Sequence, residues 1–574
     1  MAPRDGSTHL STEHARRTNV RGIGVSPGRA AGPVAQLAGA VPAPSPHERL
    51  AAGDDVEAAA ASVAEHAAAV AEGLSTAAES AEGEAAEILA TTAQMAADPT
   101  LVQSAQAKVR EEGKAPALAV WEAADAVAEQ LSALGGYMAE RARDVRDVRD
   151  RVVASLLGVP MPGIPQREEP FVLVALDLAP ADTALLDPSK VRAIVTAEGG
   201  PTSHTAILAR SLGIPAVVGA PHALEVLEEG RTVLVDGAAG TAVLDPSAED
   251  VAAAEALATH VRTFDGEGRT SDGHRVHLLA NVGEPAGAAK AAQAGAEGVG
   301  LFRTEFCFLD RNEEPTVAEQ VKAYRTVLAA FPGKKVVVRT LDAGADKPMP
   351  FLTDTAEPNP ALGVRGLRTS WRNPRILDNQ LTAIAEAAAA ESADVWVMAP
   401  MVATVDETEE FVAACNKHGL TTAGVMVEVP SAALMSGPIL ARAAFASIGT
   451  NDLTQYTMAA DRLLGSLASL SDAFHPAVLR MIEETCRGGA QQSRPVGVCG
   501  EAAADPATAV VLVGLGVSSL SMSPRSLPDV AAVLAATSLQ RCQELAQLAL
   551  GAESAEQARA LVRGQLPVLD ELGL

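Results

Sequence analysis

The C-terminal half of the chain alternates short apolar runs with helical segments. Eight apolar runs of strand length follow one another from Arg275 to the end of the chain. Strands that alternate with helices in this way predict a parallel sheet closed into a (β/α)8 barrel of the TIM type. The predicted strands are Val276–Ala280, Gly298–Phe302, Val336–Arg339, Val395–Ala399, Gly424–Val427, Phe445–Ile448, Val496–Val498 and Ser518–Met522.

An alanine-rich segment in the N-terminal half has helical periodicity. Helix-forming residues dominate from His47 to about Leu157, which predicts a helical subdomain over residues 46–157. Low-complexity disorder is the alternative for residues 51–97. Packed helices are favoured because apolar residues recur there, namely Val56, Val63, Val70, Leu74, Ile88 and Leu89. Breaks between helices are expected near Gly73, Asp98-Pro99 and Gly135-Gly136.

Short β-branched or apolar runs flank the helical segment on both sides. One strand is expected at Gly22–Val25, and four more at Phe171–Ala175, Arg192–Thr196, Ala216–Val218 and Thr232–Val235. The pattern predicts an α/β multidomain protein in which the helical subdomain is inserted into an α/β domain. The expected boundaries are 1–20 for a flexible extension, 21–45 and 158–246 for the α/β domain, 247–268 for a linker helix and 269–574 for the barrel.

Composition narrows the possible functions. A chain of 574 residues, 48% hydrophobic, can form several cores, and its net charge of -27 argues against a nucleic-acid-binding protein. The five cysteines are far apart and lack zinc-type spacing, which favours a reducing cytoplasm. We find no apolar run suited to a signal peptide or a membrane span.

A histidine stands at the start of a predicted helix behind a glycine-rich turn. Residues 193–196 read as a strand, Thr205–Leu212 as a helix that Gly213 ends, and His204 lies where the helix begins. The free N–H groups and the positive dipole end of a helix favour an anion. This position therefore suits a histidine that carries phosphate, whereas a histidine that only caps the helix is the alternative.

Several charged residues fall at the C-terminal ends of the predicted barrel strands, where barrel active sites assemble. Arg303 and Arg339 each follow an apolar strand, and two guanidinium groups suit a ligand with both phosphate and carboxylate. Arg365 and Arg462 are further candidates, although surface ion pairs are an alternative explanation for these two.

Two carboxylates and a thiol occupy neighbouring strand ends. Glu428 and Asp452, with Asn451 beside it, could hold Mg²⁺, which takes few protein oxygens and completes its shell with water and substrate. Cys499 lies at the seventh strand end, which sets it apart from the cysteines interpreted as structural, namely Cys307, Cys415, Cys486 and Cys542.

These motifs resemble those of a known family. The segment from Gly199 to Gly219 resembles the phosphohistidine signature of enzymes that use phosphoenolpyruvate. Nearly the whole chain after residue 20 resembles enzyme I of the phosphoenolpyruvate-dependent sugar phosphotransferase system. The further matching segments are Gly298–Phe306, Asp346–Pro348, Gly449–Tyr456, Cys499–Glu501 and Leu515–Pro524.

The resemblance implies a phosphotransferase that uses a nitrogen atom as acceptor. His204 would accept phosphate from phosphoenolpyruvate and pass it to HPr, the small histidine phosphocarrier, which would dock on the helical insertion. Cys499 would protonate the enolate to release pyruvate, and the barrel would form a homodimer. By the same resemblance, Mg²⁺ would bind Glu428 and Asp452, and substrate would bind Arg303, Arg339, Arg365, Asn451 and Arg462.

One departure and two competing functions bear on this interpretation. Leu463-Leu464 follows Arg462 where the family usually has Gly-Asn, which puts some substrate contacts in doubt. Pyruvate phosphate dikinase and phosphoenolpyruvate synthase share the histidine domain and the barrel, but they also need an ATP-binding domain, for which the chain has too little length and no Walker-type loop. A catalytically dead regulatory protein is disfavoured because the candidate reactive residues are all retained.

Overall fold

The structure is a computed structural model that divides into two compact units, Met1–Thr259 and His260–Leu574. Each unit is described by itself. The residues that the structure describes are 19–37, 41–51, 53–80, 84–134, 136–159, 163–165, 167–178, 182, 186–200, 203–258, 262–309, 311–343, 349–354, 356–462 and 464–574.

The first unit contains a mixed sheet of eight strands in the order β1-β8-β7-β3-β4-β5-β6-β2. Strands β3 to β6 run parallel, whereas β7 pairs antiparallel with β3 and β2 pairs antiparallel with β6. All five residues of β4 are buried, as expected for an apolar strand in the middle of a sheet. The strands are β1 (Asn19–Arg21), β2 (Ile23–Ser26), β3 (Arg29–Gln36), β4 (Phe171–Ala175), β5 (Val191–Thr196), β6 (Ala216–Val218), β7 (Thr232–Asp236) and β8 (Thr241–Leu244).

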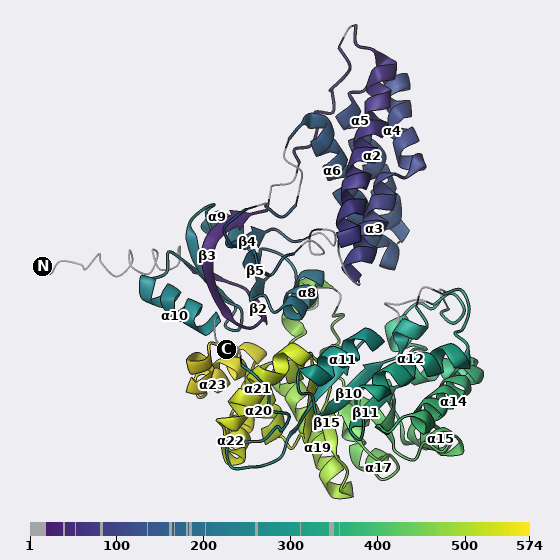
Figure 1. Cartoon of the computed structure of the whole chain (residues 1–574), viewed down its shortest axis with the longest axis vertical. Helices are drawn as coiled ribbons and strands as arrows, with labels where there is room; N and C mark the ends of the chain where they lie inside the picture. Colours follow the sequence, from purple (N-terminus) through teal and green to yellow (C-terminus); the bar gives the residue numbers. More distant parts are fainter. Residues whose placement is uncertain are drawn as a thin grey trace, which may run out of the picture. The chain divides into compact units, whose positions relative to one another are not determined.

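In the described part of the chain between β3 and β4, five helices pack alongside one another (Figure 1). Because β3 and β4 are direct neighbours in the sheet, these helices form an insertion between two paired strands. Val63, Val70, Leu74 and Leu89 are buried in their shared core, while Val56 is 39% exposed. The helices are α2 (Val56–Ser80), α3 (Glu84–Ala96), α4 (Pro99–Glu112), α5 (Pro116–Leu134) and α6 (Gly136–Leu157).

The break expected at Gly73 is wrong, because α2 continues through it to Ser80. A single glycine costs a helix only about 1 kcal/mol relative to alanine, which a long packed helix tolerates. The break at Pro99 is confirmed. Asp98 caps α4 and its carboxylate accepts hydrogen bonds from the backbone N–H groups of Thr100 and Leu101.

Two expected boundaries need correction. The extension placed at residues 1–20 includes Asn19 and Val20, which instead belong to β1 and pair with β8; residues 1–18 lie outside the described residues. The linker helix placed at 247–268 is shorter, because α10 (Ala248–Ala258) ends at Ala258. Residues 262–268 lie on the second unit, where Arg262 pairs with Asp529 and the Gly268 N–H donates to Glu297. Charged and backbone groups of the barrel thus anchor a segment that its sequence alone presents as a connector.

The second unit is a closed barrel of eight parallel strands, which confirms the predicted fold class. The strand order around the barrel is β10-β11-β12-β13-β14-β15-β16-β9, and each predicted strand overlaps an observed one. The strands are β9 (His277–Val282), β10 (Gly298–Arg303), β11 (Lys335–Arg339), β12 (Asp394–Ala399), β13 (Ala423–Val427), β14 (Ala446–Ile448), β15 (Val496–Val498) and β16 (Ser519–Met522).

Helices surround the barrel strands and bury their outer faces (Figure 1). Inside the barrel, Leu301, Val337, Met398, Met426 and Cys499 pack as a separate small cluster with Phe445. No helix among the described residues is both long and apolar enough to cross a bilayer. The main surrounding helices are α11 (Pro285–Gln293), α12 (Val317–Ala329), α14 (Pro374–Ala390), α15 (Val405–Lys417), α16 (Pro430–Leu434), α17 (Ser436–Leu440), α18 (Thr450–Met458), α19 (Pro476–Gln492), α20 (Pro506–Gly514), α21 (Leu527–Ala535), α22 (Leu539–Leu550), α23 (Ala555–Arg563) and α24 (Pro567–Leu572).

Candidate functional site

The predicted phosphate-carrying residue, His204, is the first residue of helix α8 (His204–Leu212). Ser203 caps this helix, with its Oγ accepting from the Ala206 N–H over 3.2 Å, and Gly213 ends it in the left-handed conformation. The position at a helix N-terminus is as the sequence predicts. The imidazole of His204 lies outside the described residues, as does Thr202.

The other predicted site residues belong to the second unit and gather at the C-terminal ends of the barrel strands. Arg303 and Arg339 are the last residues of β10 and β11. Glu428 directly follows β13, and Cys499 directly follows β15. Asn451 and Asp452 lie in the first turn of α18, just after β14. We call this end of the barrel the C-terminal rim.

Arg339 is held in the rim between two carboxylates. Its Nη2 lies 3.1 Å from Glu305 Oε1, and its Nη1 lies 3.1 Å from Asp342 Oδ2. Burial lowers the pKa of this guanidinium, but the negative charges of Glu305 and Asp342 raise the pKa by more than burial lowers it. The net shift of the pKa is therefore upward. Arg339 is therefore a permanent positive charge in a buried position.

Arg365 and Arg462 meet on one carboxylate. Arg365 Nη1 donates to Asp452 Oδ1 over 3.0 Å, and Arg462 Nη1 lies 3.6 Å from Asp452 Oδ2. Arg365 also donates to the hydroxyl of Tyr456 over 3.3 Å. Because Arg365 is only 5% exposed, the alternative of a surface ion pair is wrong for this residue.

Of the two leucines that follow Arg462, Leu463 lies outside the described residues and Leu464 is exposed.

Glu428 occupies a strongly negative position. Its side chain is buried, and its Oε2 accepts from the Met401 N–H over 2.9 Å. Burial raises the pKa of this carboxyl group to about 8, with a further contribution from the charges of Asp452 and Asp342. A Cβ on Gly449 would lie 2.7 Å from Glu428 Oε1, so only glycine leaves room for this carboxylate.

A divalent cation fits these carboxylates. The charges that disfavour an ionised Glu428 are the ones that a bound cation would neutralise. Among the described residues, no group of three or more histidine, cysteine or acidic side chains is arranged as a metal cluster. Two carboxylates are enough for a cation such as Mg²⁺, which keeps water or substrate oxygens in most of its shell.

The remaining predicted residues differ in their surroundings. Cys499 is 3% exposed, and burial raises the pKa of its thiol to about 11, so the thiol is protonated at neutral pH. Asn451 Oδ1 accepts from the Glu501 N–H over 3.4 Å. Arg303 is exposed at the rim beside Gly283, where a Cβ would come within 3.3 Å of its guanidinium.

Three rim residues were not predicted as part of the site, namely Glu305, Asp342 and Tyr456. Glu305 follows the end of β10 by two residues, and Asp342 follows the end of β11 by three. This position just beyond a barrel strand would have indicated from the sequence that both acids belong to the site. Tyr456 lies one helical turn beyond Asp452 on α18, and this spacing of four could have placed both on one face.

Comparison with known families matches three consecutive parts of the chain. Residues 21–141 match the family described as PEP-utilising enzyme, N-terminal, and residues 167–240 match the mobile domain of PEP-utilising enzymes. Residues 258–539 match the PEP-binding domain of the same enzymes.

Individual relatives agree with the family matches. The chain is 49% identical to a phosphoenolpyruvate-protein phosphotransferase of Streptomyces coelicolor, over 96% of this chain and 99% of the relative. It is 37% identical to one of Bacillus subtilis, over 83% of this chain and 87% of the relative. A solution structure of an enzyme I protein is 31% identical over 41% of this chain and 97% of that chain, with a TM-score of 0.36.

Proposed function

Because the chain belongs to the family of phosphoenolpyruvate-protein phosphotransferases, enzyme I of the sugar phosphotransferase system, we propose that His204 carries the phosphoryl group. His204 takes it from phosphoenolpyruvate and passes it to HPr. The observation that carries the proposal is the convergence of arginines, carboxylates and a thiol at the C-terminal rim of the barrel. Such a set suits a substrate that bears a phosphate, a carboxylate and a carbon that must be protonated.

Phosphoenolpyruvate binds at the rim through guanidinium groups in this proposal. Arg303 is exposed there and has no acidic partner among the described residues, so it is ready for an anion. Arg339, Arg365 and Arg462 already pair with carboxylates. Substrate oxygens would bind the same guanidinium groups beside these carboxylates. Asn451, next to Asp452, contacts the substrate phosphate.

Mg²⁺ is the proposed cofactor, and Glu428 and Asp452 are its proposed ligands. At the rim, four arginines lie among carboxylates that offset their charge, so the protein alone offers little excess positive charge to an anionic substrate. Held by Glu428 and Asp452, a bound cation would supply that charge and polarise the phosphate. The arginines are Arg303, Arg339, Arg365 and Arg462, and the carboxylates are Glu305, Asp342, Glu428 and Asp452.

The chemical step divides between His204 and Cys499. A neutral ring nitrogen of His204 attacks phosphorus as the bond between phosphorus and the enolate oxygen breaks. The enolate electron pair then takes a proton at carbon from the Cys499 thiol, which gives pyruvate, and water returns a proton to the thiolate. The raised pKa of Cys499 supports this role because it keeps the proton on sulfur until the enolate forms.

The partners follow the same proposal. HPr docks on helices α2 to α6, and the acidic net charge of -27 favours a partner with a basic surface. The barrel forms a homodimer, and the protein works in the cytoplasm, which suits its five free cysteines.

Transfer of label from phosphoenolpyruvate tests the proposal. With Mg²⁺ and HPr present, the wild-type protein should label itself and then HPr, whereas His204→Gln should label neither. His222→Gln is the matched control, because His222 is an exposed histidine in the same unit. Labelling of the His204→Gln variant would refute the assignment, and labelling of His204 from ATP would favour a dikinase instead.

A further inference from the structure

A cavity lies at the opposite end of the barrel from the C-terminal rim. Lys335 and Ser519, the first residues of β11 and β16, line it together with Trp396 of β12. Phe445, just before β14, forms another part of its wall. The cavity has a volume of about 300 Å³ including its open mouth. None of the residues assigned to phosphoryl transfer lines it.

The amine of Lys335 is the charged group of this cavity. Its Nζ lies 4.4 Å from the centre of the Trp396 ring, and Trp396 is oriented by a hydrogen bond from its Nε1 to Asp394 Oδ2 over 2.9 Å. Within the described ranges, this amine has no hydrogen bond or ion pair. Burial lowers the pKa of Lys335 to about 8, opposed by the carboxylates of Asp394 and Glu297. The ammonium therefore lacks the acceptor oxygens that would offset its burial.

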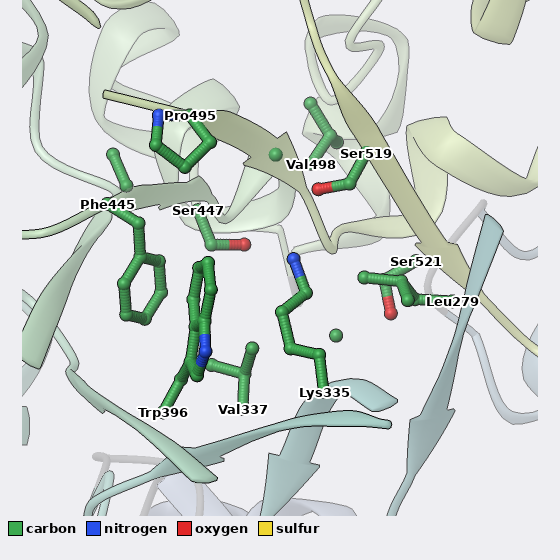
Figure 2. A pocket seen from close by; sticks show the side chains of 13 residues that line it. Leu279, Lys335, Val337, Trp396, Phe445, Ser447, Pro495, Val498, Ser519 and Ser521 are labelled. Atoms are coloured by element: carbon green, nitrogen blue, oxygen red, sulfur yellow. The ribbon is translucent and has the colours of Figure 1, made fainter. Parts of the chain in front are cut away.

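Hydroxyl groups face the same space. Figure 2 shows the oxygens of Ser447 and Ser519 and the nitrogen of Lys335 pointing toward one another across the cavity. A Cβ on Gly497 would lie 2.4 Å from Ser519 Oγ, so a glycine is needed beside this hydroxyl. Within the described parts of the chain, Ser519 Oγ has no hydrogen-bond partner. The ammonium group of Lys335 and the hydroxyl group of Ser519 thus face the same part of the cavity.

Apolar side chains form the rest of the cavity wall. The rings of Trp396 and Phe445 lie 4.8 Å apart between centres, and Leu279 and Val337 line the space with them. An aromatic and aliphatic wall around a few polar groups is typical of sites for small organic ligands.

We propose that this cavity binds a short-chain aliphatic carboxylate. The carboxylate accepts from Lys335 Nζ and the Ser519 hydroxyl, and the alkyl chain packs against Trp396 and Phe445. A single cation matches a monoanion, whereas a phosphate dianion would bring a second charge toward Asp394 with no further basic group among the residues that line the cavity. This inference does not depend on the proposed function.

Ser447 connects the cavity to the interior of the barrel. Its side chain lines the cavity, and its hydroxyl lies close enough to the Cys499 thiol to lower the pKa of that thiol. A ligand that contacts Ser447 is therefore separated from the Cys499 thiol only by the Ser447 side chain.

Fluorine NMR of protein labelled with fluorotryptophan tests the proposal, with butyrate as the probe. The chain has three tryptophans, and Trp396→Phe identifies the signal to follow. Butyrate should shift this signal in a saturable way. Lys335→Met should weaken binding at least about tenfold, a loss of about 1.4 kcal/mol. Ser519→Ala should weaken butyrate binding to a smaller extent. This conservative variant provides the test if Lys335→Met does not fold.

Two controls separate this site from others. Lys322→Met removes an exposed lysine of α12 and should leave butyrate binding unchanged. Arg339→Ala removes an anion-binding group from the rim and should also leave the Trp396 shift intact. The proposal is overturned if butyrate produces no saturable shift, if Lys335→Met and Ser519→Ala both bind as wild type does, or if inorganic phosphate binds more tightly than butyrate.

Discussion

Arg365 donates a hydrogen bond to Asp452, with 3.0 Å between Nη1 and Oδ1, and so ties the loop after β11 to the first turn of α18. One partner is a proposed substrate-binding residue and the other a proposed metal ligand. Arg462 approaches the second oxygen of the same carboxylate. If Asp452 holds the proposed cation, its carboxylate would give up guanidinium contacts, which would free Arg365 and Arg462 for substrate oxygens. We therefore expect substrate and Mg²⁺ to promote each other's binding.

Replacement of Asp452 by asparagine tests this coupling. Asp452→Asn keeps the shape of the side chain but removes the negative charge that would hold the proposed cation. We expect kcat/KM for phosphoenolpyruvate to fall by about 100-fold and the Mg²⁺ concentration for half activity to rise. Asp378→Asn, at an exposed acid of α14, should change neither value. A variant with unaltered Mg²⁺ dependence would contradict the assignment of Asp452 as a ligand.

The shape of the Arg339 guanidinium should matter as well as its charge. Arg339→Lys keeps one positive charge but replaces the planar guanidinium, which pairs with Glu305 and Asp342 through two separate nitrogens, by a single compact ammonium. Steady-state kinetics should reveal a decrease in kcat/KM of about 100-fold. Arg325→Lys on α12, where the arginine is half exposed and pairs with Glu391, provides the control. Full activity of Arg339→Lys would show that a positive charge suffices at this position and that the guanidinium shape is not required.

Loss of the Cys499 thiol should slow pyruvate formation. Cys499→Ala removes the proposed proton donor, and we expect pyruvate release to slow by about 100-fold or more. Cys415→Ala, which removes another buried thiol on α15, should leave the rate unchanged. A coupled assay for pyruvate measures both. If Cys499→Ala releases pyruvate at the wild-type rate, another group protonates the enolate.

Glu297 should make the stability of the barrel unit depend on pH. Burial raises the pKa of Glu297, but His277, Arg275 and two backbone N–H groups outweigh it and lower the pKa from 4.5 to about 2. Its ionised form is thus favoured in the folded state, so its contribution is complete above pH 4.5 and is lost as the pH falls toward 2. At pH 7, Glu297→Gln should lower the free energy of unfolding by about 3 kcal/mol.

Denaturant titrations of the wild type and Glu297→Gln at pH 7 and pH 3 measure this effect. The difference between the two proteins should be smaller at pH 3, because the wild-type carboxylate is then largely protonated in the unfolded chain. Glu284→Gln replaces an exposed acid just before α11 and should have little effect at either pH. An equal difference at both pH values would show that the ionised carboxylate is not the stabilising form.

The barrel strands were predictable because parallel strands buried on both faces appear as continuous apolar runs. All five residues of β13, for example, are apolar or glycine and buried. Gly73 shows the limit of such local reasoning. A glycine indicates a possible helix end, but burial of Val70 and Leu74 in the helical core stabilises α2 on both sides of it.

The sequence by itself determined the strand ends, and with them the presence of Arg339, Glu428 and Cys499 on one rim, because the carboxyl ends of parallel barrel strands meet at one edge. Only the tertiary structure decided that Arg365 and Arg462 share Asp452, and that Lys335 and Ser519 line one cavity. These contacts join residues from separate loops or from strands far apart in the chain. No local periodicity encodes such pairs, since their distances depend on how the barrel closes and how its loops fold over it.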